Sequence, residues 1–267
     1  MKKPKNDRAL RFYNEVLGLE HLHYGIWNDD DELTIANLKL AQKRYEDLLA
    51  DNIPADVKTT LESGCGTGAM WTRMLAMGLD AEALSPDVNQ MEMLTKKIKA
   101  PFHFCRFEDF EPSKQYDMVL MSESCQYVPL DQIFSRVKRS LRSKGYWMIC
   151  DYFTLDNAEG VMAKSGHNFN KFMQLARENG FELLKERDIT REATRTLDFA
   201  RDLVRKGRTG VDIITEKFRH DHPLMTRFVG WLLRKKIRKL NESEELLDSK
   251  KFMAGKKYIF LLFQRGD

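Results

Sequence analysis

A glycine-dense turn constrains this chain more than any other feature of its sequence. The run Val57-Lys58-Thr59-Thr60-Leu61-Glu62 predicts a strand, residues 69–77 predict a helix, and Ser63-Gly64-Cys65-Gly66-Thr67-Gly68 lies between them. Glycine adopts positive φ without a steric penalty and lets a ligand approach the backbone closely. A strand, a glycine-rich turn and a helix in this order predict the nucleoside- or phosphate-binding corner of a doubly wound sheet.

Glu62, at the end of the predicted strand, narrows the class of ligand. A carboxylate repels phosphate, so a pyrophosphate ligand is disfavoured. A ligand that carries an ammonium group and hydroxyls suits this position better.

Strands and helices alternate over most of the chain, which favours a mostly parallel sheet with helices on both faces. The 267 residues, 42% of them hydrophobic, suffice for one full core or for one domain with a large insertion. The predicted strands are residues 57–62, 79–84, 102–107, 116–122, 146–153, 181–189 and 258–264, and the main predicted helices are 35–49, 69–77, 88–98, 130–141 and 168–179.

The order acid-x-Gly-x-Gly-x-Gly resembles motif I of the class I S-adenosylmethionine-dependent methyltransferases. Tyr116-Asp117 resembles the opening of that family's fourth strand, and residues 140–145 resemble the turn before its fifth, without the usual Pro and first Gly. The resemblance covers residues 57–153 and the last two strands. It implies a seven-stranded, Rossmann-like sheet of order 3-2-1-4-5-7-6 with an antiparallel last strand. It also implies S-adenosylmethionine as cofactor and methyl transfer as the activity.

The same resemblance implies which residues hold the cofactor. The family usually binds both ribose hydroxyls with an acid after the second strand, but Ala83 occupies that position here and Glu82 is expected on the other face. A subgroup that acts on lipids and other small molecules resembles this chain in lacking the acid, so Gln90 is predicted to bind the ribose. The full predicted set is Tyr24, Glu62, Gly64, Cys65, Gly66, Gly68, Leu84, Ser85, Gln90, Phe107, Glu108 and Ser122.

Tyr24 belongs to this set because of the aromatic stretch His23-Tyr24-Gly25-Ile26-Trp27. It resembles a stretch in the tocopherol methyltransferase-like and cyclopropane-synthase-like relatives, where an aromatic residue closes over the methionine end of the cofactor. The alternative is a turn between helices with core aromatics.

Three residues are candidates for chemistry on the acceptor: Tyr127, Asp151 and His167. Tyr127 follows the fourth strand, where acceptor and methyl meet in the family. Asp151 lies on the fifth strand, and His167 is a possible base in a loop. Each also has a structural alternative, because a buried acid or a loop histidine commonly serves packing or capping. The His pair of some sugar O-methyltransferases is absent. Since methyl transfer depends mainly on positioning, a strong base is not required.

Composition excludes several other classes. The four cysteines show no metal-ligand spacing, so no metal site is predicted, and free thiols favour the cytoplasm. No apolar run is long enough to span a bilayer, and the N-terminus lacks a signal core. A formal charge of +4 does not by itself indicate a nucleic-acid partner. The oligomeric state is open.

Residues 191–256 do not look like sheet and are interpreted as a helical lid inserted before the last strand. The predicted organisation is 1–52 as an N-terminal lid segment, 53–190 as the core, 191–256 as the lid and 257–267 as the final strand. Helices are expected at 197–206, 211–218 and 224–240. The third is basic on one side, which fits a solvated face, an anionic or membrane-surface contact, or nucleic acid.

The sequence therefore predicts a methyltransferase for a small, partly apolar organic acceptor under a helical lid, with O-methylation preferred. Two rivals remain: an RNA or protein methyltransferase, and a non-catalytic protein that binds S-adenosylmethionine as a scaffold.

Overall fold

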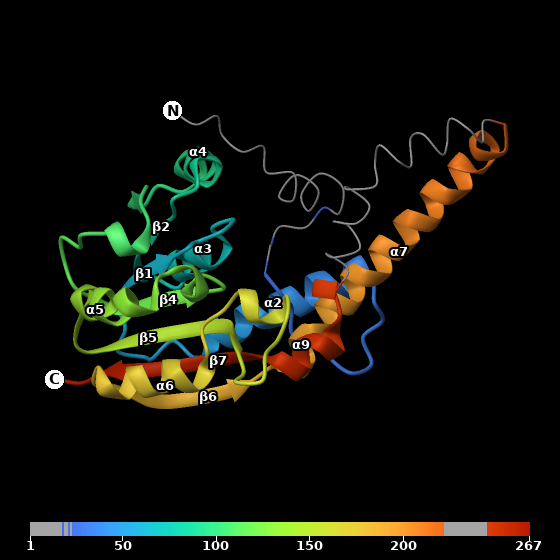
Figure 1. Cartoon of the computed structure of the whole chain (residues 1–267). Coiled ribbons are helices and arrows are strands. Elements are labelled where there is room, and N and C mark those ends of the chain that lie inside the picture. The colour runs from blue at the N-terminus through green and yellow to red at the C-terminus, as the bar shows by residue number, and fades with distance from the viewer. Residues whose placement is uncertain (1–17, 19–20, 22, 222–244) are drawn as a thin grey trace.

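The computed structural model describes residues 18, 21, 23–221 and 245–267 (Figure 1). These residues form one seven-stranded sheet in the order β3-β2-β1-β4-β5-β7-β6. Neighbours among the first five strands are parallel, and β7 runs antiparallel to both β5 and β6. The predicted strand order and antiparallel last strand are confirmed. The strands are β1 (Thr59–Ser63), β2 (Asp80–Leu84), β3 (Phe102–His103), β4 (Tyr116–Ser122), β5 (Leu141–Thr154), β6 (Phe181–Asp188) and β7 (Lys256–Arg265).

Several of the helices begin where the sequence supplies a side-chain cap. Thr34, Asp87 and Asn168 each accept a hydrogen bond from a backbone N–H of the first turn that follows. The helices are α2 (Ile35–Asp51), α3 (Ala69–Ala76), α4 (Val88–Lys97), α5 (Leu130–Ser140), α6 (Phe169–Glu178), α7 (Thr190–Asp221) and α9 (Ser249–Gly255), with 3-10 turns η2 (Phe107–Asp109), η3 (Cys125–Tyr127) and η4 (Met162–Lys164).

Strand β4 explains why the sheet is covered on both faces. Its residues 118–121 are all apolar and fully buried, and successive side chains point to opposite faces. Met118 and Leu120 pack in one core cluster, which includes residues of α2 and α3. Val119 and Met121 pack in the other, with residues of α5 and α6. A near-continuous apolar run is therefore the pattern of a central strand with helices above and below it.

Three predicted boundaries are wrong. Strand β3 pairs with β2 only through Phe102 and His103, because the chain turns back at once as the Cys105 amide donates to the carbonyl of His103. Strand β5 includes the predicted turn at 143–145, which is an irregularity inside the strand, with Lys144 at φ 59°. The helices predicted at 197–206 and 211–218 are one helix, α7, because single glycines weaken a helix without ending it.

The described part of the 191–256 insertion is α7 and α9. Helix α7 packs against α9 and β7 near its start and extends beyond the sheet (Figure 1). The predicted helix at 224–240 lies outside the described residues, so the lid and the domain boundaries remain predictions. In the parts of the chain that the structure describes, no helix has both the length and the apolar character needed to cross a membrane.

Candidate active site

A cavity of about 450 Å³ lies at the carboxyl ends of β1, β2 and β4. The strand order reverses between β1 and β4, so this is the topological switch point at which doubly wound sheets bind ligands. Loops after the three strands line it together with α2, α3 and the segment before α2. The lining residues are His23, Tyr45, Glu46, Leu49, Glu62, Gly64, Cys65, Gly66, Thr67, Ala69, Met70, Ser85, Pro86, Asp87, Gln90, Ser122, Glu123, Ser124 and Tyr127.

The glycine turn after β1 is shaped by three positive φ angles, 76° at Gly64, 53° at Gly66 and 77° at Gly68. A Cβ on Gly64 would lie 2.5 Å from Cβ of Ser124, and one on Gly68 would lie 2.6 Å from Cδ2 of Leu94. A Cβ on Gly66 would meet no atom within 4 Å. Gly64 and Gly68 therefore let the turn pack closely against the loop after β4 and against α4, whereas Gly66 keeps space open at the cavity wall.

Glu62 is the buried acid of the cavity. The residue is only 3% exposed, and Oε2 of its carboxyl group has no hydrogen-bond partner. Burial, with a smaller contribution from the charge of Glu46, raises its pKa to about 8. A buried, unpartnered carboxyl oxygen is costly unless a ligand satisfies it. This atom marks a place where a cationic or hydroxyl group of a ligand would be bound.

The first turn of α4, which follows β2, supplies a second unpartnered oxygen. Asp87 caps α4 by accepting hydrogen bonds from the amides of Asn89 (2.7 Å) and Gln90 (3.0 Å). This cap holds the Gln90 side chain at the cavity, where its buried Oε1 has no partner. Ser85 accepts from the Asp87 amide at 3.2 Å and is itself buried. Glu82 does not line the cavity, since it points away to His103, Lys114 and Tyr116.

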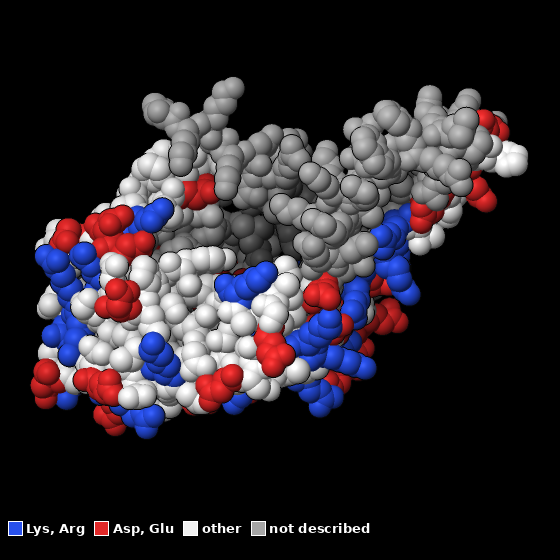
Figure 2. All heavy atoms as spheres, in the orientation of Figure 1, with Lys and Arg blue, Asp and Glu red and all other residues white. Residues whose placement is uncertain are grey.

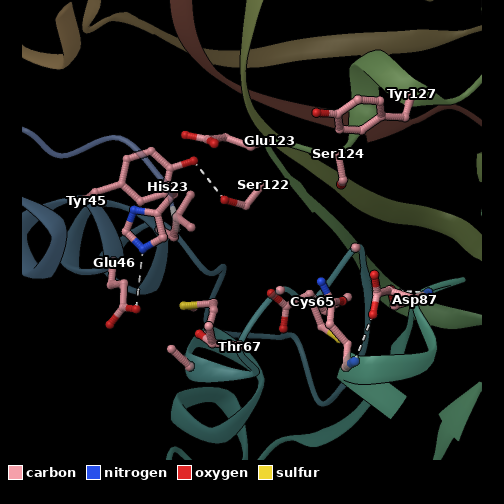
Figure 3. A pocket seen from close by; sticks show the side chains of 18 of the residues that line it. His23, Tyr45, Glu46, Cys65, Thr67, Asp87, Ser122, Glu123, Ser124 and Tyr127 are labelled. Carbon is pink, nitrogen blue, oxygen red and sulfur yellow. Dashed lines mark hydrogen bonds and ion pairs between the residues drawn. The ribbon is translucent and has the colours of Figure 1, made fainter. Parts of the chain in front are cut away.

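Glu123 follows β4 with a left-handed backbone, φ 49°. Its Oε1 accepts hydrogen bonds from the hydroxyl of Tyr258 (2.5 Å) and the amide of Tyr24 (2.8 Å). Burial raises the pKa of Glu123, although the charge of His23 and the two hydrogen bonds oppose the rise. Positive φ is uncommon for a residue with a side chain and tends to occur at functional sites. The backbone thus turns a carboxyl group into the cavity at the end of a central strand (Figure 3).

Helix α2 forms a further wall of the cavity, through Tyr45, Glu46 and Leu49 (Figure 3). The Tyr45 hydroxyl interacts with Oγ of Ser122 (2.8 Å) and donates to the carbonyl of Cys150 (3.1 Å). Glu46 lies one residue on and faces His23. Burial favours the neutral form of Glu46, but contacts with His21 and His23 outweigh it and lower the pKa to about 2. The wall therefore combines an apolar aromatic surface with a fixed negative charge.

The aromatic stretch before α2 is held between two helices. The Ile26 amide donates to the carbonyl of Ala41 in α2, and Thr196 of α7 accepts from the Gly25 amide (3.0 Å) and the Trp27 indole (2.9 Å). A Cβ on Gly25 would lie 2.6 Å from Cβ of Ala41, so only glycine permits this approach. The ring of Tyr24 packs against Phe252 and Tyr258.

Eight of the predicted site residues line the cavity: Glu62, Gly64, Cys65, Gly66, Ser85, Gln90, Ser122 and Tyr127. Burial, and to a smaller extent the charge of Glu62, raises the pKa of the Cys65 thiol. Cys65 is therefore not a thiolate nucleophile. Five predicted cofactor residues lie outside this lining. They are Tyr24 and Gly68, described above; Leu84, whose carbonyl accepts from the Gly64 amide; Phe107, which is in the core; and Glu108, 3.7 Å from Arg106.

The three predicted catalytic residues all belong to or contact the turn η3, but only Tyr127 lines the cavity. Tyr127 is 76% exposed and lines the cavity. Asp151 is buried outside the lining and accepts hydrogen bonds from the amides of Gln126 (3.1 Å) and Tyr152 (2.8 Å), which hold the turn η3. His167 also lies outside the lining, and its Nε2 donates to the carbonyl of Cys125 at 3.0 Å. These contacts hold the side chains of Asp151 and His167 against the loop after β4, and their catalytic roles stay predictions.

Sequence reasoning missed several lining residues. Glu123 could have been found by the rule that selected Glu62, since both are acids at the carboxyl end of a central strand. Tyr45 and Glu46 carried no such signal, because α2 precedes β1 and nothing in its helical pattern says which face meets the cavity. His23 was placed in a functional stretch, but only as a neighbour of Tyr24.

Comparison with known proteins agrees with this geometry. A family model described as "Methyltransferase domain" matches residues 38–196. No curated protein sequence matches significantly. Among solved structures, a putative sarcosine dimethylglycine methyltransferase from Galdieria sulphuraria is 15% identical, with a TM-score of 0.72 and 98% of each chain covered.

Two further structures are similar at the same level. The geranyl diphosphate C-methyltransferase from Streptomyces coelicolor A3(2) is 16% identical, with a TM-score of 0.68, covering 97% of this chain and 94% of that one. The [4+2]-cyclase SpnF is also 16% identical, with a TM-score of 0.70, covering 97% and 93%. At these identities the structural likeness establishes the fold.

Proposed function

The chain belongs to the methyltransferase-domain family and is an S-adenosylmethionine-dependent methyltransferase, and from this premise we propose that it methylates a small, partly apolar organic acceptor. The observation that carries the proposal is a pair of acids, Glu62 and Glu123, that lie at the carboxyl ends of two adjacent central strands and line one cavity. Glu62 suits the cofactor, and Glu123 suits the acceptor.

The residues around the glycine turn fit S-adenosylmethionine. The unpartnered Oε2 of Glu62 would accept from the ammonium group or a ribose hydroxyl, and the unpartnered Oε1 of Gln90 would accept from the ribose. Gly66 leaves open the space that a side chain would take from the cofactor. When bound, S-adenosylmethionine supplies an electrophilic methyl group on its sulfonium.

Glu123 is proposed to take the proton that an acceptor hydroxyl loses on methylation. Its pKa is raised by burial, which makes the carboxylate a better proton acceptor, and Tyr258 and Tyr24 fix its position. This is the reason for preferring O-methylation. Tyr45, Leu49, Met70 and Tyr127 provide apolar surface in the same cavity, which suits a partly apolar acceptor.

The remaining parts of the proposal concern the surroundings of the site. The aromatic stretch at 23–27 and the insertion at 191–256 are proposed to cover the cavity. The cytoplasm is proposed as the location because Cys65, Cys105, Cys125 and Cys150 are free thiols. On the face seen in Figure 2 the described Lys and Arg are interleaved with Asp and Glu, which favours a small acceptor over a nucleic acid on that face.

Calorimetry with S-adenosylmethionine, followed by transfer of labelled methyl to a panel of hydroxylated apolar compounds, tests the proposal. Glu123→Gln should bind the cofactor normally and lose about 100-fold or more in turnover. Glu92→Gln, on the exposed side of α4, serves as the matched control and should keep full activity. Binding without transfer to any acceptor would favour a scaffold, and transfer only to RNA or protein would favour the macromolecular rival. A protein that does not bind S-adenosylmethionine would refute the proposal.

A further inference from the structure

Three side chains beside the cavity direct polar atoms at one another. Nδ1 of His21, Nε2 of His23 and a carboxylate oxygen of Glu46 all lie within 4.8 Å of one another. Oε1 of Glu46 is 2.9 Å from Nδ1 of His21 and 3.6 Å from Nε2 of His23. All three atoms are buried, and none has a partner with hydrogen-bond geometry. Across residues 23–221, 245–267 and the two described positions before them, this is the one such group of three.

The contacts of His23 leave Nε2 as the ring atom that faces Glu46. Nδ1 of His23 is 2.7 Å from the carbonyl oxygen of Tyr24. A carbonyl only accepts, so Nδ1 carries a hydrogen and donates it there. Nε2 lies 3.6 Å from Oε1 of Glu46, which is too long for a direct hydrogen bond. Two ligands each ~2.1 Å from one tetrahedral ion would be about 3.4 Å apart.

Further contacts from α2 hold the three side chains of the cluster in place. Gln42, one turn before Glu46 on α2, donates to the backbone carbonyls of His23 (2.8 Å) and His21 (3.3 Å). The ring of His23 also stacks on Tyr45, with centroids 4.4 Å apart and planes at 24°. The same helix thus positions the backbone, one ring and the carboxylate. Locked ligands and a carbonyl behind the imidazole are features of built metal sites.

We propose that His21, His23 and Glu46 bind one divalent transition-metal ion, for which Zn²⁺ is the best match to two imidazoles and a carboxylate. Three protein ligands leave a coordination position for water or for an oxygen of a ligand. Because His23 and Glu46 line the cavity, that position faces it (Figure 3). The ion would also fasten the segment before α2 to that helix.

The open position suggests what the acceptor carries. A Zn²⁺-bound hydroxyl loses its proton more readily, so a hydroxyl on the acceptor would be both oriented and activated there. This consequence rests on the proposed methyl transfer, whereas the metal site itself does not.

Titration of the full chain with Co²⁺ after treatment with a chelator tests the site. Co²⁺ should bind in one equivalent with visible absorption bands, and Zn²⁺ should displace it. Glu46→Gln and His23→Gln should each weaken Co²⁺ binding by about 100-fold or more. Zn²⁺ should raise the melting temperature of the wild type and leave that of the variants nearly unchanged.

The matched control is a second histidine–glutamate pair. His103 lies 2.6 Å from Glu82, but there Lys114 and Tyr116 also contact the carboxylate, and among the residues that the structure describes no second histidine joins the pair. His103→Gln should keep the wild-type affinity for Co²⁺. If folded wild type binds Co²⁺ no more tightly than folded Glu46→Gln, or does not bind it at all, the cluster is an ion-pair network and the proposal is wrong.

Cofactor titration separates this proposal from the previous one. S-adenosylmethionine is added to the chelator-treated and to the Zn²⁺-loaded protein. Metal binding without cofactor binding would refute the proposed function and support the metal site. Cofactor binding without metal binding would refute the metal site and leave the proposed function supported.

Discussion

The hydroxyl of Tyr258 and the carboxylate of Glu123 are joined by a hydrogen bond of 2.5 Å. It connects β7, the last strand of the chain, to the loop after β4. Tyr258 is fully buried, and its ring contacts those of Tyr24, in the segment before α2, and Tyr45, on α2. The orientation of the proposed base thus depends on a residue more than a hundred positions away.

Tyr258→Phe removes this hydrogen bond while it keeps the buried ring. We expect turnover to fall by about 10-fold because Glu123 loses its orientation, with little change in the affinity for S-adenosylmethionine. Steady-state kinetics and calorimetry measure the two effects separately. Tyr146→Phe, which removes a hydroxyl 3.4 Å from Asp56 on an exposed part of the sheet, is the control. A fall in cofactor affinity equal to the fall in turnover would contradict the positioning role.

Gly66→Val should abolish binding of S-adenosylmethionine, because the side chain would enter the open space beside the turn. Gly78→Val is matched to it, since Gly78 also has positive φ, 84°, and open surroundings but lies outside the cavity lining. Both substitutions should cost about 1–2 kcal/mol of folding free energy from the left-handed backbone. Calorimetry should show loss of binding in the first variant alone. Equal cofactor affinity in the two would show that Gly66 does not face the cofactor.

Gly64→Ala should destabilise the folded protein by about 2–4 kcal/mol, from a left-handed backbone at φ 76° and a contact of 2.5 Å with Cβ of Ser124. Urea unfolding of the protein without ligand measures the free energy. In the double variant Gly64→Ala, Ser124→Gly the clash is absent, so the two changes should couple favourably. Strict additivity would mean that the close approach of the two loops is not what requires glycine.

The pH dependence of stability should carry the signature of Glu62. Its pKa is raised by burial and by Glu46 to about 8, whereas in the unfolded chain it is about 4.3. Between these values unfolding releases a proton, so stability is full below the unfolded pKa and falls as the pH rises towards 8. The contribution is at most about 1.4 kcal/mol per pH unit.

Glu62→Gln removes that ionisation, so its urea midpoint should fall less than that of the wild type between pH 5 and 8. Binding of S-adenosylmethionine at pH 7 should also release a proton in the wild type, because a cationic partner favours the carboxylate. Calorimetry in buffers of different ionisation enthalpy detects this. Parallel pH profiles for both proteins would rule out a raised pKa at Glu62.

Much of the cavity lining around the glycine turn was predictable, because motif residues are local in sequence. The turn at 63–68 and the cap at Asp87 place Glu62, Gly66 and Gln90 through short-range geometry, which can be predicted from the residue types. Prediction was poorer for the loop after β4 and the strand beside it. Asp151 was selected as an acid on a central strand, but it lies outside the cavity lining, and its carboxylate accepts hydrogen bonds from the amides of Gln126 and Tyr152.

The sequence by itself determined the alternation of strands and helices, the doubly wound class and the glycine turn, because periodicity, caps and positive-φ positions act over a few residues. Only the tertiary structure decided which side chains converge. His21, His23 and Glu46 meet because α2 packs beside the segment that precedes it, and Glu123 meets Tyr258 because β7 returns antiparallel to β5. Such contacts depend on the packing of distant elements, which residue spacing does not encode.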